Sequence, residues 1–430
     1  MRRTAAVVGI AIAAAIGVTA VAAVLGPTAS APTPAPAAMA QPADPIARAQ
    51  ERLRLVPGDW RTWAALAVAY VERGRVTADP TNYPRAEEAA RRSLAVKPKD
   101  NGDALVAQGA LANARHDFAA ARKLALAATK INGYDADAYA VLADAETQLG
   151  NVKAATAAVQ RLLDLRPGLS AYARGSYDLE QRGMVSAATD LMNQALAAAV
   201  STADIGFCRV QLGDLAWYAG DLAGAAREYE LGLAADPGSI ALQRGRARVD
   251  WANGRIDAAL AGYADLTRRA PTPSYVLEYA EFLRAAGRTT QAQAQLDLAS
   301  TAHRLFTGAG GVDGLTGTAL ALAAGDPATA LKEARAEWSR RTHADVADNL
   351  AWALHHAGRD AEALPYARRA VASGARSATY AYHLGVIELA LGQTGAGRGH
   401  VAEAVRVNPY FSPIDAPLAR KLLAGPEVTR

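Results

Sequence analysis

Cysteine and aromatic residues are scarce in this chain. Cys208 is the single cysteine among 430 residues, so the chain can form no internal disulfide, no cysteine-pair metal site and no lipid anchor on an N-terminal cysteine. Hydrophobic residues make up 51% of the chain and aromatic residues only 6%, and the sequence is visibly rich in alanine. Alanine has the best helix propensity, so we expect a helical protein with Cys208 as a small core residue.

Signals for strands and for a nucleic-acid surface are also absent. No sustained run of alternating β-branched residues occurs. The net charge is +4, and charges of both signs are interspersed, as in RAEEAARRSLAVKPKDNGD. A nucleic-acid groove needs clustered Lys and Arg with aromatic residues on one face, so we interpret these charges as solvated helix faces and expect no nucleic-acid partner.

Catalytic motifs are missing as well. The chain has no His-Glu-x-x-His motif, no nucleophile elbow and no cysteine pair, so the prediction is a non-catalytic protein without a cofactor. The stretch TGAGGVDGLTG at 307–317 has neither the preceding strand nor the Lys-Ser/Thr pair of a phosphate loop, and we interpret it as a flexible joint.

Histidines gather late in the chain, at His343, His355, His356, His383 and His400. His355 and His356 are adjacent, so on a helix they point about 100° apart and do not easily face one metal ion. We assign no metal site to them. A role of this cluster in metal handling is kept as an alternative.

The feature that the chain does have is a repeat. The segment 211–238, QLGDLAWYAGDLAGAAREYELGLAADPG, predicts a helix, a tight turn and a second helix that ends at Asp-Pro-Gly. Equivalent turn residues follow one another at spacings of 42, 34, 33, 37, 34, 33, 38, 33 and 34. These residues are Gly74, His116, Gly150, Gly183, Gly220, Gly254, Gly287, Gly325, Gly358 and Gly392. A period near 34 with helix–turn–helix character indicates a solenoid.

Each unit repeats the same pattern of small residues. An alanine stands five residues after the turn in eight units, at Ala121, Ala155, Ala188, Ala225, Ala259, Ala292, Ala330 and Ala363. A packing residue follows four positions later, large in Val159, Met192, Tyr229, Tyr263, Leu296 and Val401. Small residues at the first position let two antiparallel helices approach closely, and prolines such as Pro237 and Pro271 end the units.

This pattern resembles the tetratricopeptide-repeat family. The resemblance covers roughly Trp60 to Phe411 and implies an all-α, right-handed superhelical solenoid of about ten hairpins. It also implies that ligands contact the first helix of each hairpin, on the concave side. The flanking stretches WRTWAALAVAYVERGR and FSPIDAPLARKL further resemble a group of exported or membrane-anchored actinobacterial repeat proteins.

The N-terminal segment indicates export. Arg2 and Arg3 precede an uncharged stretch from Thr4 to Gly26, which fits either an uncleaved transmembrane anchor or a cleaved signal peptide. In both cases the arginines stay inside and the repeats lie outside. The predicted divisions are 1–26 for this segment, 27–43 for a Pro/Ala-rich linker, 44–424 for the solenoid with a looser joint near 306–317, and 425–430 for a tail.

The inner positions of the first helices are the candidate binding residues. They are Tyr177, Glu180, Asp214, Trp217, Tyr218, Arg244, Arg248, Trp251, Glu281, Arg284, Asp345, Asp348, Trp352, His355 and His356. Aromatic residues beside arginines are typical of binding hot spots, so we expect Trp217 and Trp251 to be exposed in the groove. The alternative is that they pack between units.

These observations predict a non-catalytic scaffold on the outer side of the cytoplasmic membrane. It would bind a protein or an extended peptide in the central groove. The alternative is an accessory or metal-handling subunit of a cell-envelope transport system.

Overall fold

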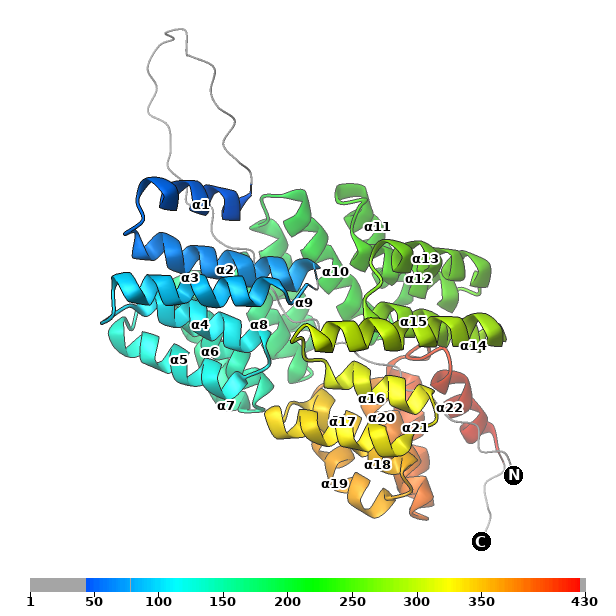
Figure 1. Ribbon diagram of the computed structural model, residues 1–430. Helices are drawn as coiled ribbons and strands as arrows, with labels where there is room; N and C mark the ends of the chain where they lie inside the picture. The colour runs from blue at the N-terminus through cyan, green and yellow to red at the C-terminus, as the bar shows by residue number, and fades with distance from the viewer. Residues whose placement is uncertain (1–43, 78, 426–430) are drawn as a thin grey trace.

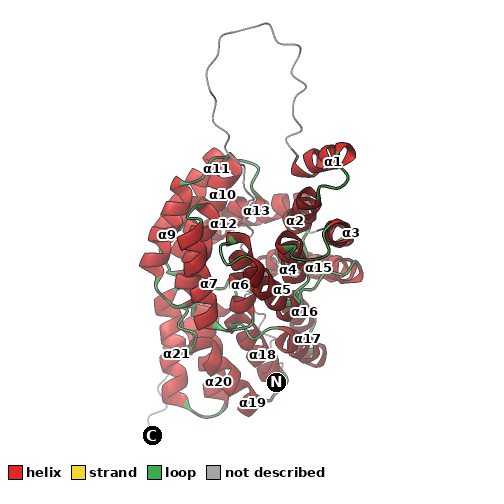
Figure 2. Cartoon of the chain, turned by 90° about the vertical axis from the view of Figure 1, so that its left-hand side faces the viewer, coloured by secondary structure: helices red, strands yellow, loops and turns green. Residues whose placement is uncertain are grey.

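A computed structural model describes residues 44–77 and 79–425, and this part of the chain consists of helices and short connections (Figure 2). It contains 22 helices and no strand within those residues, which confirms the predicted all-α class. Many helices begin at a side-chain cap that accepts a hydrogen bond from a first-turn N–H group. Asp117, Asp135, Asp221 and Asp326 make such caps, and each satisfies a donor that the helix itself leaves free.

Twenty of the helices form ten antiparallel hairpins between a leading helix, α1 (Pro45–Leu55), and a trailing helix, α22 (Asp415–Ala424). The hairpins are α2 (Trp60–Thr77) with α3 (Asn82–Val96), α4 (Gly102–Ala114) with α5 (Phe118–Ile131), α6 (Ala136–Gln148) with α7 (Val152–Leu165), α8 (Leu169–Gln181) with α9 (Val185–Ala197), α10 (Thr202–Tyr218) with α11 (Leu222–Ala235), α12 (Ile240–Ala252) with α13 (Ile256–Arg269), α14 (Pro273–Ala285) with α15 (Thr289–Gly308), α16 (Gly314–Ala323) with α17 (Pro327–Arg340), α18 (Ala344–His356) with α19 (Asp360–Val371), and α20 (Ala378–Ala390) with α21 (Thr394–Val407). The predicted solenoid of about ten hairpins is confirmed.

The repeated small residues form the core as expected. The eight alanines that follow the turns are at most 3% exposed. Tyr229, a packing residue of α11, is fully buried, and its ring touches the positions where Gly213 and Gly245 would carry a Cβ, at 2.3 and 2.5 Å. The two glycines therefore make room for one tyrosine between consecutive first helices.

The chain folds back on itself, so the solenoid makes two passes. The first pass comprises α4–α11, the second comprises α16–α22, and α12–α15 connect them. In Figure 1 the chain runs from the blue and cyan helices on the left through the green helices at the upper right to the yellow and red helices below. Turns of the first pass touch loops of the second pass about 190 residues later, as the hydrogen bond from Asn408 to the carbonyl oxygen of Trp217 shows at 2.8 Å.

The surroundings of the turn glycines reflect these contacts between the passes. The eight from Gly150 to Gly392 have φ between 71° and 78°, a conformation that favours glycine, whereas Gly74, predicted as a turn residue, lies inside α2. A Cβ at Gly150, Gly183 or Gly220 would also lie 2.8, 2.3 or 2.6 Å from a carbonyl oxygen of the second pass. A Cβ at the equivalent Gly254 or Gly287 would meet nothing within 4 Å. Three consecutive turns are therefore shaped for the second pass as well as for the hairpin.

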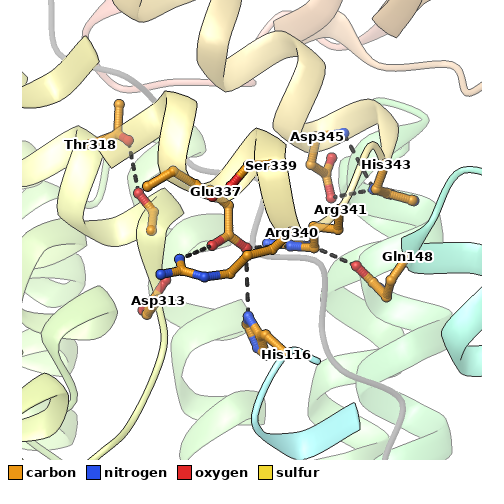
Figure 3. Close-up of polar contacts among 12 residues, drawn as sticks. His116, Gln148, Asp313, Thr318, Glu337, Ser339, Arg340, Arg341, His343 and Asp345 are labelled. Atoms are coloured by element: carbon orange, nitrogen blue, oxygen red, sulfur yellow. Dashed lines mark hydrogen bonds and ion pairs between the residues drawn. The ribbon is translucent and has the colours of Figure 1, made fainter. Parts of the chain in front are cut away.

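A buried polar cluster joins the two passes at the end of α17 (Figure 3). The carboxylate of Glu337 is fully buried, pairs with Arg341 and lies 3.5 Å from Nδ1 of His116 in the first pass. Nη1 of Arg341 donates to Gln148 at 2.6 Å. Against the effect of burial, His116 and Arg341 lower the pKa of Glu337 to about 2, so this carboxyl group stays ionised at neutral pH.

Three predicted segments fall partly or wholly outside the described residues. The segments 1–26 and 27–43, and all of the predicted tail except Gly425, lie outside them. Within the described part, no helix combines the length and apolar character that a membrane span requires. The predicted joint near 306–317 covers the end of α15, a short connection and the first residues of α16.

Candidate binding cavity

A cavity of about 140 Å³ lies between the two passes. The first helices α8, α10, α12 and α14 provide one side, and α18, α20 and the connections before α20 and α22 provide the other. The lining side chains that carry a charge or an aromatic ring are Tyr177, Glu180, Asp214, Trp217, Tyr218, Arg248, Glu278, Glu281, Phe282, Asp345, Arg376, Tyr380, Tyr410 and Phe411. The volume is about ten times the minimum that holds one water molecule, so the cavity has room for a ligand group.

Three carboxyl groups, from α8, α10 and α18, interact with one another in the cavity. Burial raises the pKa of Glu180 to about 8, and the charges of Asp214 and Asp345 add to this effect. Asp345 accepts a hydrogen bond from the hydroxyl of Tyr380 and lies 3.4 Å from His343. Although burial acts in the opposite direction, His343 and Tyr380 lower the pKa of Asp345. Asp345 therefore has partners, whereas Glu180 faces mainly negative neighbours.

Two arginines and one glutamate form a buried ion-pair group on another wall. Glu278 receives Nε of Arg244 at 2.5 Å and Nε of Arg248 at 2.8 Å. Burial would raise the pKa of Glu278, but the two arginines outweigh it and lower the pKa to about 2. Nη1 of Arg248 also lies 3.9 Å from Asp214. The positive charge of this wall is thus largely compensated by its own carboxylates.

Two polar atoms of the lining have no hydrogen-bond partner among the described residues. They are Oε1 of Glu281 and Nη1 of Arg248. Glu281 is 5% exposed, and burial followed by the charge of Glu278 raises its pKa well above the ordinary value. Unpaired buried polar atoms cost free energy, so both atoms are suited to receive a ligand.

Aromatic rings complete the walls. Trp217 and Tyr218 project from the last turn of α10, and the guanidinium carbon of Arg248 lies 6.0 Å from the Trp217 ring centroid. Burial raises the pKa of Tyr218 to about 12, with Asp214 adding to the shift. The hydroxyl of Tyr177 lies 3.5 Å from Nε2 of His343 across the two passes. The cavity therefore offers carboxylates, ring faces and a few donors close together.

Ten hairpins at a period near 34, packed through the repeated alanines and with six of their first helices around a cavity, identify the architecture. The chain has the tetratricopeptide-repeat fold. No protein-family model matches its sequence, and no curated protein does.

Solved structures of helical-repeat proteins match this chain at low sequence identity. Yeast Tom70 is 15% identical, covers 88% of each chain and has a TM-score of 0.43. The human IFIT1 dimer with PPP-AAAA is 14% identical over 84% of this chain and 86% of that one, with a TM-score of 0.46. The protein TTC0263 of Thermus thermophilus is 23% identical over 42% of this chain and 98% of that one, with a TM-score of 0.38. These likenesses concern the fold alone.

The structure brings about half of the predicted binding residues of the tetratricopeptide-repeat groove to the cavity. The residues that line it are Tyr177, Glu180, Asp214, Trp217, Tyr218, Arg248, Glu281 and Asp345. The residues outside its lining are Arg244, Trp251, Arg284, Asp348, Trp352, His355 and His356. The role of the first group in partner binding stays a prediction.

The expected exposure in the groove is wrong for Trp217. Trp217 is 6% exposed and packs in the core around Tyr229 while one side faces the cavity. Trp352 is 1% exposed and stacks on His383 with ring centroids 3.9 Å apart. Trp251 is partly buried with its ring edge-on to Phe282 at 4.9 Å. Packing between neighbouring units, the alternative for Trp217 and Trp251, accounts for these positions.

The late histidines pair with separate carboxylates. Nδ1 of His355 lies 2.5 Å from Asp360, Nδ1 of His383 lies 2.9 Å from Asp348, and Nδ1 of His400 lies 2.7 Å from Glu388. Burial lowers the pKa of His356 to about 4. No group of three potential metal ligands occurs among the described residues, so the metal-handling alternative gains no support from this cluster.

Sequence reasoning missed Glu278, Tyr380 and the second-pass wall around Asn408. A signal for the first two exists in the repeat itself. Arg244 and Glu278 are 34 residues apart, and Asp345 and Tyr380 are 35 apart, so complementary groups stand at equivalent positions of consecutive first helices. Asn408 carries no such signal, because it reaches the cavity only through the return of the chain.

Proposed function

We propose that this protein is a non-catalytic scaffold that binds an extended segment of a protein partner in the central cavity. The observation that carries the proposal is the pair of unpartnered buried atoms, Oε1 of Glu281 and Nη1 of Arg248, in a cavity lined by the first helices. An extended peptide offers both an N–H donor and a carbonyl acceptor at each residue. It can therefore satisfy an acceptor and a donor in the same wall.

The composition of the walls supports the same ligand. Tyrosine and tryptophan provide a large apolar contact with a polar edge, which is the usual chemistry of peptide and protein recognition. Asn408 holds the second pass against the first by its hydrogen bond to the carbonyl oxygen of Trp217, and the hydroxyl of Tyr380 fixes Asp345 within the second pass. The cavity is thus preorganised, which reduces the entropy cost of binding.

Filling the cavity tests the proposal. Linear peptides are selected from a displayed library on the full-length protein, and their affinities are measured for the wild type and for Ser274→Tyr. Ser274 lines the cavity at the start of α14, so the added ring occupies the space of the ligand. We expect an affinity loss of at least about tenfold, or about 1.4 kcal/mol.

A matched substitution controls for the chemical change. Ser339→Tyr places the same ring on an exposed position at the end of α17 and is expected to leave affinity unchanged. Peptides that bind Ser274→Tyr as well as the wild type, with equal melting temperatures, would place the binding surface elsewhere and refute the proposal.

We further propose that the solenoid works outside the cytoplasmic membrane, held or delivered by the segment before Pro27. The support is the sequence: Arg2-Arg3 followed by an uncharged stretch to Gly26. Protease added to cells with a permeabilised outer layer should digest the repeats and spare a tag placed before Arg2. A mature N-terminus at Gln41 would indicate cleavage, and full protection of the repeats would reverse the orientation.

A further inference from the structure

The lining of the cavity has more acidic than basic side chains among the described residues. Five carboxylate side chains and two arginines line it. Arg376 is exposed, and Arg248 already pairs with Glu278. Of the carboxylates, Asp345 and Glu278 have close partners, and Asp214 accepts a hydrogen bond from Tyr229 at 2.6 Å. Glu180 and Glu281 are the two whose charge the described residues leave without a close basic partner.

Of these groups, Glu281 is the one that most clearly lacks a partner. Its side chain lines the cavity, it is 5% exposed, and its Oε1 accepts no hydrogen bond from the described residues. The charges that act on it include two further acids, Glu278 and Asp415, together with Arg284 and Arg248. A buried carboxylate in such a place needs either a proton or a cation.

Resting on the proposed function, we propose that the cavity selects a basic side chain of the bound segment, a lysine ammonium or an arginine guanidinium. Oε1 of Glu281 accepts its hydrogen bond, Glu180 and Asp214 supply further negative charge, and the rings of Trp217 and Tyr218 cover its apolar stem. Ring faces attract cations, and a charge-assisted hydrogen bond is about twice as strong as a neutral one.

An acidic or neutral side chain fits the same walls less well. An anion would meet Glu180, Asp214 and Glu281, and the one internal arginine that faces the cavity is already shared between Glu278 and Asp214. A neutral group would leave Oε1 of Glu281 either unpaired or protonated.

Proton release is a second signature of cation binding. Glu180 is surrounded by Asp214 and Tyr218 of α10, Tyr177 of α8 and Asp345 of α18. Its pKa of about 8 means that much of it is protonated at neutral pH. A cation beside it favours the ionised form, so binding releases protons and tightens as pH rises from 6 to 8.

The first experiment uses n-butylammonium chloride on the full-length protein, with equimolar sodium chloride and n-butanol as references. The readout is the rise in melting temperature relative to each variant's own ligand-free value. We expect a rise for n-butylammonium only, and an affinity at least about tenfold weaker in Glu281→Gln. Glu230→Gln, an exposed glutamate on α11, is the matched control and should behave as the wild type.

The second experiment uses the cavity-dependent peptides from the library. Replacing their basic residue by acetyl-lysine or citrulline should weaken binding at least about tenfold, and calorimetry in two buffers should show proton release. Peptides that bind in the cavity without an essential basic residue overturn the inference and leave the proposed function standing.

The two experiments separate the two ideas. In one outcome, n-butylammonium raises the melting temperature of the wild type but not of Glu281→Gln, and no peptide from the library depends on the cavity. This outcome supports the cation site and refutes the proposed function. It points to free amines as the ligands. The same n-butylammonium response in Glu281→Gln as in the wild type overturns the cation site.

Discussion

The pKa of a single half-buried carboxyl group, that of Glu180, links the cavity to the stability of the molecule. Burial, with Asp214 and Asp345 nearby, raises the pKa of Glu180 from 4.5 to about 8 in the folded state. Between these two pH values the folded protein holds the proton more tightly than the unfolded chain does. Stability therefore falls as pH rises through this window, and the favourable contribution is complete only below the unfolded pKa.

Glu180→Gln removes this titration without changing the size of the side chain. We expect the variant to gain stability over the wild type as pH rises, and the difference at pH 8 should exceed that at pH 5 by at least about 1.4 kcal/mol, the equivalent of one pKa unit. Urea unfolding at pH 5, 6, 7 and 8 measures it. If the free energy of unfolding of the variant changes with pH in parallel with that of the wild type, Glu180 titrates normally. The control is Glu230→Gln.

Trp217 is a second residue whose environment decides its role. Because it is 6% exposed and packs with Leu242 and Val249, Trp217→Ala should cost about 3 kcal/mol or more of stability. Trp251 is only partly buried, so Trp251→Ala should cost less. If urea unfolding shows equal and small losses of stability in the two variants, both residues would fit the hypothesis of exposed binding hot spots.

Residue by residue, the sequence predicts packing better than exposure. The alanines after each turn were identifiable because small side chains recur at one register, and burial follows from that register alone. The exposure of Trp217 depends on which groups of other units and of the second pass come near it. Residues on one helix face share a direction, but spacing within a unit does not show what lies opposite that face.

At the scale of single elements, the hairpin turns divide into two classes that look identical in the sequence. Gly183 and Gly287 have φ angles of 72° and 75°, so a side chain at either costs about 1–2 kcal/mol in backbone strain. They differ in surroundings: an added Cβ would lie 2.3 Å from the carbonyl oxygen of Gly374 at the first position and meets nothing within 4 Å at the second.

The pair Gly183→Ala and Gly287→Ala isolates the contact between passes. Both variants carry the same strain of an alanine at positive φ, but only in Gly183→Ala does the added Cβ force the second pass to move. We expect it to be the less stable of the two by about 1–3 kcal/mol, the usual cost of overpacking. The measurement is the free energy of unfolding in urea, and equal losses would mean that the two passes do not touch firmly at this turn.

For the molecule as a whole, the sequence repeat predicts the solenoid but not its closure, by which we mean the contact of the second pass with the first. The period near 34, the turn glycines and the alanine register depend on local geometry, which is the same in every unit, so ten hairpins could be predicted from the sequence. The meeting of the passes depends on the small rotation between neighbouring units, accumulated over about 190 residues. No single residue pattern encodes this accumulated rotation. The position of the cavity wall around Tyr380 and Asn408 depends on it, so that wall could not be predicted.

Closure also changes how the molecule should unfold. An open array of repeats is coupled only between neighbours and can lose its ends separately. Here Thr342 donates its hydroxyl to Leu149 at 2.8 Å, and Asn408 donates to Trp217 at 2.8 Å, so units far apart in sequence stabilise one another. The wild type should therefore unfold in urea with coincident circular dichroism and tryptophan fluorescence transitions, as a single cooperative unit does.

Thr342→Val together with Asn408→Ala removes these two hydrogen bonds. The carbonyl oxygen of Leu149 loses the hydroxyl of Thr342, and that of Trp217 loses the amide of Asn408 but keeps the N–H of Gly220. We expect a cost of about 1 kcal/mol for each bond, and it falls on the contact between passes. We expect the two transitions to separate in this double variant, with the second pass unfolding first because it then depends on neighbour contacts alone. Thr301→Val, which removes an exposed hydrogen bond within α15, should keep them coincident. A double variant that still unfolds in one step would mean that the neighbour contacts along the solenoid, and not its closure, carry the cooperativity.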